Sequence, residues 1–456
     1  MEGKENSEEF DGGLYPELEN FGEALVRRFL AKNGFAAKLS KRMSAETSTK
    51  FIDWIDHVVL PESDVSYDFL SYTGLKEDSA QARPDGARVF RHPRSYLFPI
   101  LVGKNKETEI SLKPEELDRF VQALGIAVAL DGGAFAPLRR AVISRQGDHV
   151  LSAVERRGCS GFAAKAAGDA KEYVEALNGF LHRERSFDVE QEGLDCVEQL
   201  VDSALKVMGS ERVCDAFLRS ERVFWQSRNK AGRTQKARQD LLGLGWGNHD
   251  HHAFRSSREN FARMLALFGK MGLSFRERYY AGEQAGWGAQ VLENMACGVV
   301  VFADVDLRPE ESGTDFSQAG LEHGRELGTV GLWVGLHGES LLQAGMHHLA
   351  ARFDFEKLGG DLKKSGLKLM APFSKFEFLK QAFTAGEEWK ADGARLDRLL
   401  GDSSITQAQH KKFKSEGAIG SHLEDLERGQ GFKGFNNSPV TKIVKGTDPG
   451  AQAVGA

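Results

Sequence analysis

Cysteine is scarce in this 456-residue chain, with four residues and no CxxC pair. Structural zinc sites take closely spaced thiolates, so the positions of these four residues argue against such a site. Scattered cysteines in a chain of this length are typical of a reducing compartment, and we expect a cytoplasmic location. The four residues are Cys159, Cys196, Cys214 and Cys297.

Long apolar runs and dense basic runs are also missing. No stretch approaches the roughly 18 apolar residues that indicate a membrane helix. Residues 1–10 are acidic and polar, unlike the basic start and apolar core of a secretory signal. The net charge of −6 comes without a lysine- and arginine-rich segment. We therefore expect neither a membrane nor a nucleic acid as a partner.

The remaining composition is that of a soluble globular protein, with 41% hydrophobic and 28% charged residues. Its length predicts two or three domains. Changes in residue pattern divide it into five parts. These are a disordered start with helices (1–50), a first strand-rich unit (51–165), a helical bridge (166–240), a second strand-rich unit (241–440) and a flexible tail (441–456).

The two strand-rich units open and close in the same way. The first opens with IDHVVL at 55–60, and the second with HDHHAF at 249–254, each followed by a helical pattern. Segments that contain ER, then glycine and GF, close them at 142–162 and 419–435. The shared order predicts an internal duplication.

Within the second unit, the apolar patterns predict particular elements. Helices are expected at 257–270 and about 355–365, and a loop at 308–328. The expected strands are 249–254, 291–294, 298–307, 331–336 and 347–353.

Two histidines and one carboxylate form a recurrent ligand set of non-haem Fe(II) oxygenases. Three segments of the second unit could supply these ligands, because alternation along a strand puts residues i and i+4 on one face. Each segment then aligns a candidate ligand with an arginine: His251 with Arg255, His348 with Arg352, and Glu424 with Arg428.

The same residues allow other interpretations. A one-residue shift in register would exchange His251 with His252, or His348 with His347. Any of these histidines could be a hydrogen-bonded core residue, and Glu424 or Arg255 could belong to an ion pair. Asp304 and Asp306 could supply a carboxylate, although a solvated strand end is the simpler expectation. In the first unit, His57, Glu109 and Glu155 are the counterparts of the three candidate ligands, and we expect a degenerate structural copy without a metal.

The motifs resemble the vicinal-oxygen-chelate superfamily. Asp250 to Arg255 matches the DH-x-AFR motif of the 2-oxoadipate dioxygenase/decarboxylase (hydroxyglutarate synthase) family. Glu424 to Arg428, followed by GFKGFN at 431–436, resembles the closing strand and turn of the 4-hydroxyphenylpyruvate dioxygenase family. The resemblance covers about 240–440 well and 50–165 weakly. The closing turn is not identical, and two adjacent histidines stand where one is expected.

This resemblance implies an α+β fold of two related βαβββ units, each partly rolled around a cavity and joined by the helical bridge. It implies that His251, His348 and Glu424 hold Fe(II), and that Arg255 binds the substrate carboxylate. Phe432 and Phe435 would form an apolar wall. The expected activity is oxidative decarboxylation and hydroxylation of a small 2-oxo acid with dioxygen.

Several alternatives remain open from the sequence. One is a metal-dependent isomerase or lyase of the same fold, using Ni(II), Co(II) or Zn(II). Another is a metal-free protein that binds a small ligand. An arginine clamp favours a dicarboxylic substrate, and phenylalanine walls favour an aromatic one. Whether the chain forms a homo-oligomer also stays open.

Overall fold

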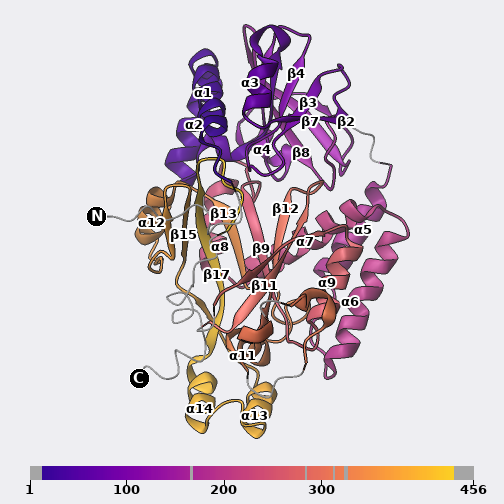
Figure 1. Ribbon diagram of the computed structural model, residues 1–456, viewed down its shortest axis with the longest axis vertical. Coiled ribbons are helices and arrows are strands. Elements are labelled where there is room, and N and C mark those ends of the chain that lie inside the picture. The colour runs from indigo at the N-terminus through magenta and orange to yellow at the C-terminus, as the bar shows by residue number, and fades with distance from the viewer. Residues whose placement is uncertain (1–12, 165–167, 283–284, 312–313, 323–326, 436–456) are drawn as a thin grey trace.

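Two large β-sheets and a bundle of helices make up the computed structural model (Figure 1). The structure describes residues 13–164, 168–282, 285–311, 314–322 and 327–435. The expected disordered start falls largely outside these ranges, and the expected tail falls wholly outside them. None of the described helices combines the length and apolarity needed to span a bilayer.

Two N-terminal helices precede the first sheet, within the residues 1–50 where helices are expected. They are α1 (Pro16–Lys32) and α2 (Gly34–Arg42). The first unit then contains β1 (Ile55–Pro61), α3 (Tyr67–Tyr72), β2 (Lys76–Ala82), β3 (Arg88–Arg91), β4 (Ile100–Gly103), β5 (Thr108–Leu112), α4 (Leu117–Ala123), β6 (Leu130–Asp131), β7 (Leu138–Gln146) and β8 (His149–Arg156).

Four helices follow the first sheet, as the composition of this region predicts, and pack along the second unit (Figure 1). They are α5 (Ala170–Leu181), α6 (Glu190–Leu205), α7 (Ser210–Ser227) and α8 (Lys230–Asp240). Their apolar faces share one core with the second sheet, which includes Phe217 and Trp225 from α7 and Phe254 from the sheet. Because this core is continuous, the helices hold the second sheet rigidly from one side.

The second unit is the longer of the two. It contains β9 (His249–Arg255), α9 (Phe261–Lys270), β10 (Ser274–Tyr280), β11 (Trp287–Asn294), β12 (Val299–Asp306), α10 (Phe316–Ala319), α11 (Thr329–His337), β13 (His348–Arg352), α12 (Phe355–Lys364), β14 (Ser374–Phe376), β15 (Leu379–Phe383), β16 (Glu387–Trp389), α13 (Gly393–Gly401), α14 (Gln407–Glu416) and β17 (Ala418–Arg428).

The two sheets have the same topology. The first has the strand order β2-β3-β4-β1-β5-β8-β7-β6, and the second has β10-β11-β12-β9-β13-β17-β15-β14. In both, the two central strands are antiparallel to each other, and each is parallel to its outer neighbour. This identity of order and direction confirms the α+β fold class and the duplication. The sequence predicted one βαβββ module in each unit, whereas each sheet contains two.

One predicted strand is wrong. The segment 331–336 lies inside helix α11, which is buried almost all round. A short apolar run does not distinguish a buried helix from a buried strand by periodicity. Asp306 favours the helix, because its carboxylate accepts hydrogen bonds from the backbone of Gly328, Val330 and Gly331 in the first turn.

Candidate metal centre

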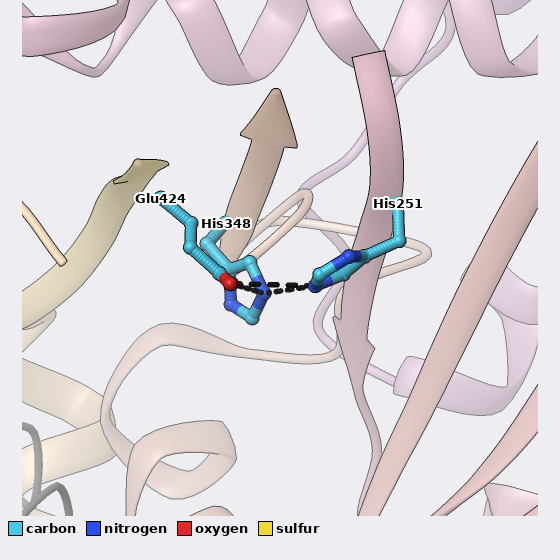
Figure 2. A group of neighbouring side chains, drawn as sticks. All are labelled: His251, His348 and Glu424. Carbon is cyan, nitrogen blue, oxygen red and sulfur yellow. Dashed lines mark hydrogen bonds and ion pairs between the residues drawn. The ribbon is translucent and has the colours of Figure 1, made fainter. Parts of the chain in front are cut away.

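Three neighbouring strands of the second sheet bring the predicted ligands together (Figure 2). His251 comes from β9, His348 from β13 and Glu424 from β17. All three are buried, and one ligand atom from each lies within 4.8 Å of the others. Within the described ranges, this is the single such cluster of histidine, cysteine and acidic side chains.

The distances between these atoms suit a shared metal ion. Glu424 Oε2 lies 3.2 Å from His348 Nε2 and 3.3 Å from His251 Nε2, and the two imidazole nitrogens are 3.3 Å apart. Donor atoms held about 2.1 Å from one ion lie about 3 Å from their neighbours. Two imidazoles and a carboxylate on one side of the ion are also the donor set of a facial triad. The residues therefore fit a divalent transition metal.

The charges of the triad also favour a cation. Burial alone would lower the pKa of His251, but the Glu424 carboxylate and the bond to Asp250 raise it to about 9. Burial alone would raise the pKa of Glu424, yet the two imidazoles lower it to about 2. A buried positive charge is thus stabilised at this point, and a bound metal ion would replace the proton.

Polar side chains around the triad orient its members. Asp250 lies 3.1 Å from Nδ1 of His251, and it receives two hydrogen bonds of 2.8 and 2.9 Å from Arg428. Gln381 of β15 donates to Glu424 Oε1 at 2.8 Å. Such contacts fix the tautomer and rotation of metal ligands. Asp250 and Arg428 were parts of the sequence motifs without an assigned role, and Gln381 was missed.

Replacing Gln381 with leucine should weaken metal binding by about tenfold, because Glu424 loses the bond that holds its rotamer. An anaerobic Fe(II) titration would measure the change. Gln290→Leu is a matched control, since Gln290 is also buried but bonds to backbone carbonyls of β10 and β11. Equal losses of affinity in both variants would argue against an orienting role for Gln381.

A cavity of about 80 Å³ opens beside the triad. Arg255 lies in its wall, 3.8 Å from the Asp304 carboxylate. Burial raises the pKa of Asp304 to about 7, which Arg255 only partly offsets. Asp304 and Asp306 are both buried, so the expectation of a solvated strand end was wrong. The cavity is small beside the roughly 300–1,000 Å³ of sites for drug-sized ligands, and it fits a small molecule.

Aromatic rings form most of the remaining wall. Phe435 stands 5.2 Å from the ring of His251, edge on, and belongs to this wall. Phe432 does not, because it is fully buried in a separate cluster with Leu379 and Leu426. The cavity has further aromatic lining residues that no sequence motif indicated: Tyr279, Trp287, Phe302, Phe373 and Phe383.

The structure separates the members of each adjacent histidine pair. His252 points away from the cavity, where Arg222 contacts its Nε2 and the Val300 carbonyl its Nδ1. His347 lines the cavity, but its Nδ1 lies against Nδ1 of His348 at 3.1 Å, so it stands behind the triad. His251 and His348 are therefore the histidines placed to bind a metal.

The first sheet holds a different cluster at the equivalent position. Its strand registers place His57 and Glu109 where the second sheet has His251 and His348, but Ser152 stands at the position of Glu424. The prediction that Glu155 is the counterpart of Glu424 was therefore wrong. Glu155 points to the other face and bonds to the backbone of Leu117 and to Arg157.

Arginines neutralise the carboxylate of this first-sheet cluster. Glu109 pairs with Arg83 and Arg140 at 2.8 Å each, and it accepts a 2.5 Å hydrogen bond from Ser152. Burial alone would raise the pKa of Glu109, but these arginines lower it to about 2. Two arginines thus already pair with this carboxylate, which agrees with a degenerate copy of the site.

No protein-family model and no curated protein matches the chain. Among solved structures, a triple mutant of 4-hydroxymandelate synthase from Streptomyces coelicolor is similar over 90% of this chain and 98% of its own, with 12% identity and a TM-score of 0.25. Methylmalonyl-CoA epimerase from Mycobacterium tuberculosis is similar over 40% and 88%, with 12% identity and a TM-score of 0.23.

A glyoxalase I mutant from Zea mays is similar over 23% of this chain and 43% of its own, with 14% identity and a TM-score of 0.18. Likeness at these scores assigns no activity. The paired βαβββ modules of the two sheets agree with the fold that the sequence resemblance implies.

Proposed function

We propose that this protein is an Fe(II)-dependent dioxygenase that decarboxylates and hydroxylates a small 2-oxo acid. The buried triad of two histidines and one glutamate beside a small aromatic cavity is the observation that carries this proposal. This donor set leaves part of a metal's coordination sphere free for a chelating substrate and dioxygen. An arginine in the same cavity supplies a partner for an organic acid.

The bound iron would supply the redox chemistry that activates dioxygen. The side chains of this chain bind the substrate, orient the metal ligands and exclude water. Arg255 holds the substrate carboxylate, since its guanidinium can form two parallel hydrogen bonds with such a group. Phe435 and the neighbouring rings keep water away from the reacting carbon. Gln381 and Asp250 hold Glu424 and His251 in place.

The overall reaction balances with dioxygen as the single co-reactant. The bond between the carboxylate carbon and the keto carbon breaks, and carbon dioxide leaves. One oxygen atom enters the new carboxylate on the former keto carbon, and the other enters a C–H bond of the same molecule as a hydroxyl. Dioxygen is reduced and the acid is oxidised, so no separate reductant is consumed.

An oxygen-electrode screen tests this proposal. The anaerobically iron-loaded protein would be mixed with 2-oxo acids that carry a second carboxylate (2-oxoglutarate, 2-oxoadipate) or an aromatic ring (phenylpyruvate). We expect oxygen uptake with equal release of carbon dioxide for at least one class. Binding of the acids without oxygen uptake would instead support a binding protein, and conversion without uptake an isomerase or lyase.

Arg255→Ala should weaken substrate binding by about tenfold to a hundredfold while leaving iron binding nearly unchanged. The expected loss corresponds to about 1.5–3 kcal/mol for hydrogen bonds to a charged group. Isothermal titration of a 2-oxo acid and a separate Fe(II) titration would measure the two effects. Equal losses of acid and iron binding would contradict the assigned role of Arg255.

A further inference from the structure

A second cavity, of about 250 Å³, lies between the two sheets and apart from the metal centre. Its wall contains the closing arginine of each unit, Arg156 from β8 and Arg428 from β17. Each arginine holds an aspartate of the opening strand in its own unit, Asp56 or Asp250. The cavity is therefore lined by corresponding parts of the two duplicated units.

Lys113 and Arg352 also occupy corresponding positions in this wall. Lys113 directly follows β5, and Arg352 is the last residue of β13; these are the corresponding central strands of the two sheets. The registers of β1 with β5 and of β9 with β13 align the two residues. Within the described part of the chain, neither has a carboxylate partner at ion-pair distance. Two facing cations without partners make a strongly positive region between the units.

The rest of the wall does not neutralise this charge. Seven lysine and arginine side chains line the cavity, against three carboxylates, and two of the seven pair outside the wall: Arg91 with Asp78 at 3.4 Å and Arg276 with Glu277 at 2.5 Å. Asp56 and Asp250 are already bound by Arg156 and Arg428, and Glu293 pairs with Lys433 at 2.6 Å. Burial, with further help from Arg352, lowers the pKa of Lys113 to about 8, which the Asp56 carboxylate only partly offsets.

We propose that this cavity binds a small polyanion that carries phosphate or carboxylate groups. The two cations without partners, Lys113 and Arg352, favour an anion with two or more negative charges over a neutral ligand. The volume exceeds that of the metal-site cavity about threefold and admits a ligand larger than the proposed substrate site does. Lys113 and Arg352 are the residues that bind it, because they have no internal partner to give up.

The bound anion would lie next to the residues that support the metal centre. Arg428 and Asp250 line this cavity, and Asp250 contacts His251 on its other side. The anion site is nevertheless built from different residues than the triad and Arg255. Its existence does not depend on the proposed dioxygenase activity, and its test can succeed or fail alone.

Calorimetric titration of the full chain with sulfate, as a phosphate-like oxyanion, and with succinate, as a dicarboxylate, tests this proposal. We expect at least one to bind, which identifies the preferred group. Lys113→Met combined with Arg352→Met should weaken that binding by at least about tenfold. Lys171→Met is the control, because Lys171 is 81% exposed and lies on the helical bridge.

Binding should survive in His348→Ala, which separates this cavity from the metal centre. Circular dichroism would check that the double variant is folded; if it is not, Lys113→Met alone carries the test, since Lys113 has no ion pair among the described residues to lose. Absence of binding by both anions, equal binding by the wild type and the Lys113 variant, an equal loss in Lys171→Met, or loss in His348→Ala would each overturn the proposal.

Discussion

Replacing any one member of the triad with alanine is expected to abolish stoichiometric iron binding. His251, His348 and Glu424 each supply one donor atom to a cluster whose members lie within 4.8 Å of one another. Removing one leaves a two-ligand site that cannot hold a divalent ion against water. Elemental analysis after anaerobic loading and desalting would measure the iron retained by His251→Ala, His348→Ala and Glu424→Ala.

His57→Ala is the matched control for this experiment. His57 occupies the position of His251 in the first sheet, is equally buried, and bonds to Asp56 as His251 contacts Asp250. Its loss should perturb stability to a similar degree while leaving the iron content at the wild-type level. Normal iron in the three triad variants would mean that the metal binds elsewhere, and loss of iron in His57→Ala would point to a general folding defect.

Removing either closing arginine is expected to destabilise the protein by about 3–5 kcal/mol, because each leaves a buried aspartate without its counter-charge. Arg428→Met strands Asp250, and Arg156→Met strands Asp56. The two arginines also bind carbonyl oxygens of their closing loops, Arg428 at Phe432 and Gly434, and Arg156 at Cys159 and Gly161. Urea unfolding of both variants would measure the loss of unfolding free energy.

Only Arg428→Met should also weaken iron binding, by about 10- to 100-fold. Asp250 is the residue that orients His251, whereas Asp56 contacts His57, which belongs to no triad. The pair of variants thus separates a stability effect, which both share, from an effect on the metal ligand. A similar fall in iron affinity after Arg156→Met would show that the loss follows from general destabilisation.

Much of the site could be predicted because it lies on regular strands. Alternation along β9, β13 and β17 fixes which face of the sheet each residue occupies. The three ligands lie on the same face, as the alternation predicts. The choice between adjacent histidines could not be made from sequence, because a shift of one residue reverses both faces. The strand registers decide it in favour of His251 and His348.

The shared ligand-to-arginine spacing does not bring the three arginines to one cavity. Arg255 lines the metal cavity, but Arg352 and Arg428 line the cavity between the sheets, although all three stand four residues beyond a ligand. The reason is strand direction: β9 runs antiparallel to β13 and β17, so the residue four positions beyond its ligand lies toward the opposite end of the sheet. Phe432 was misplaced for a different reason, since the closing loop turns it back into the core.

Residues from distant segments were the hardest to predict. Gln381 lies 43 positions before Glu424 in the chain, on a neighbouring strand whose register no local pattern fixes. The alternation of Gln381 with Phe383 was the one available signal, and β16, α13 and α14 separate their strand from β17 in the chain. Helix α11, which is buried almost all round, was similarly hidden, because its apolar run lacks a polar face.

The central claim is tested most directly by supplying dioxygen labelled with oxygen-18 to the iron-loaded protein and a 2-oxo acid, then analysing the product by mass spectrometry. The proposed reaction predicts a hydroxy acid one carbon shorter than the substrate, with label in both the new carboxylate and the new hydroxyl. An unlabelled product with the full carbon skeleton, or unchanged acid, would contradict an oxygenase and leave the same buried triad to serve a different chemistry.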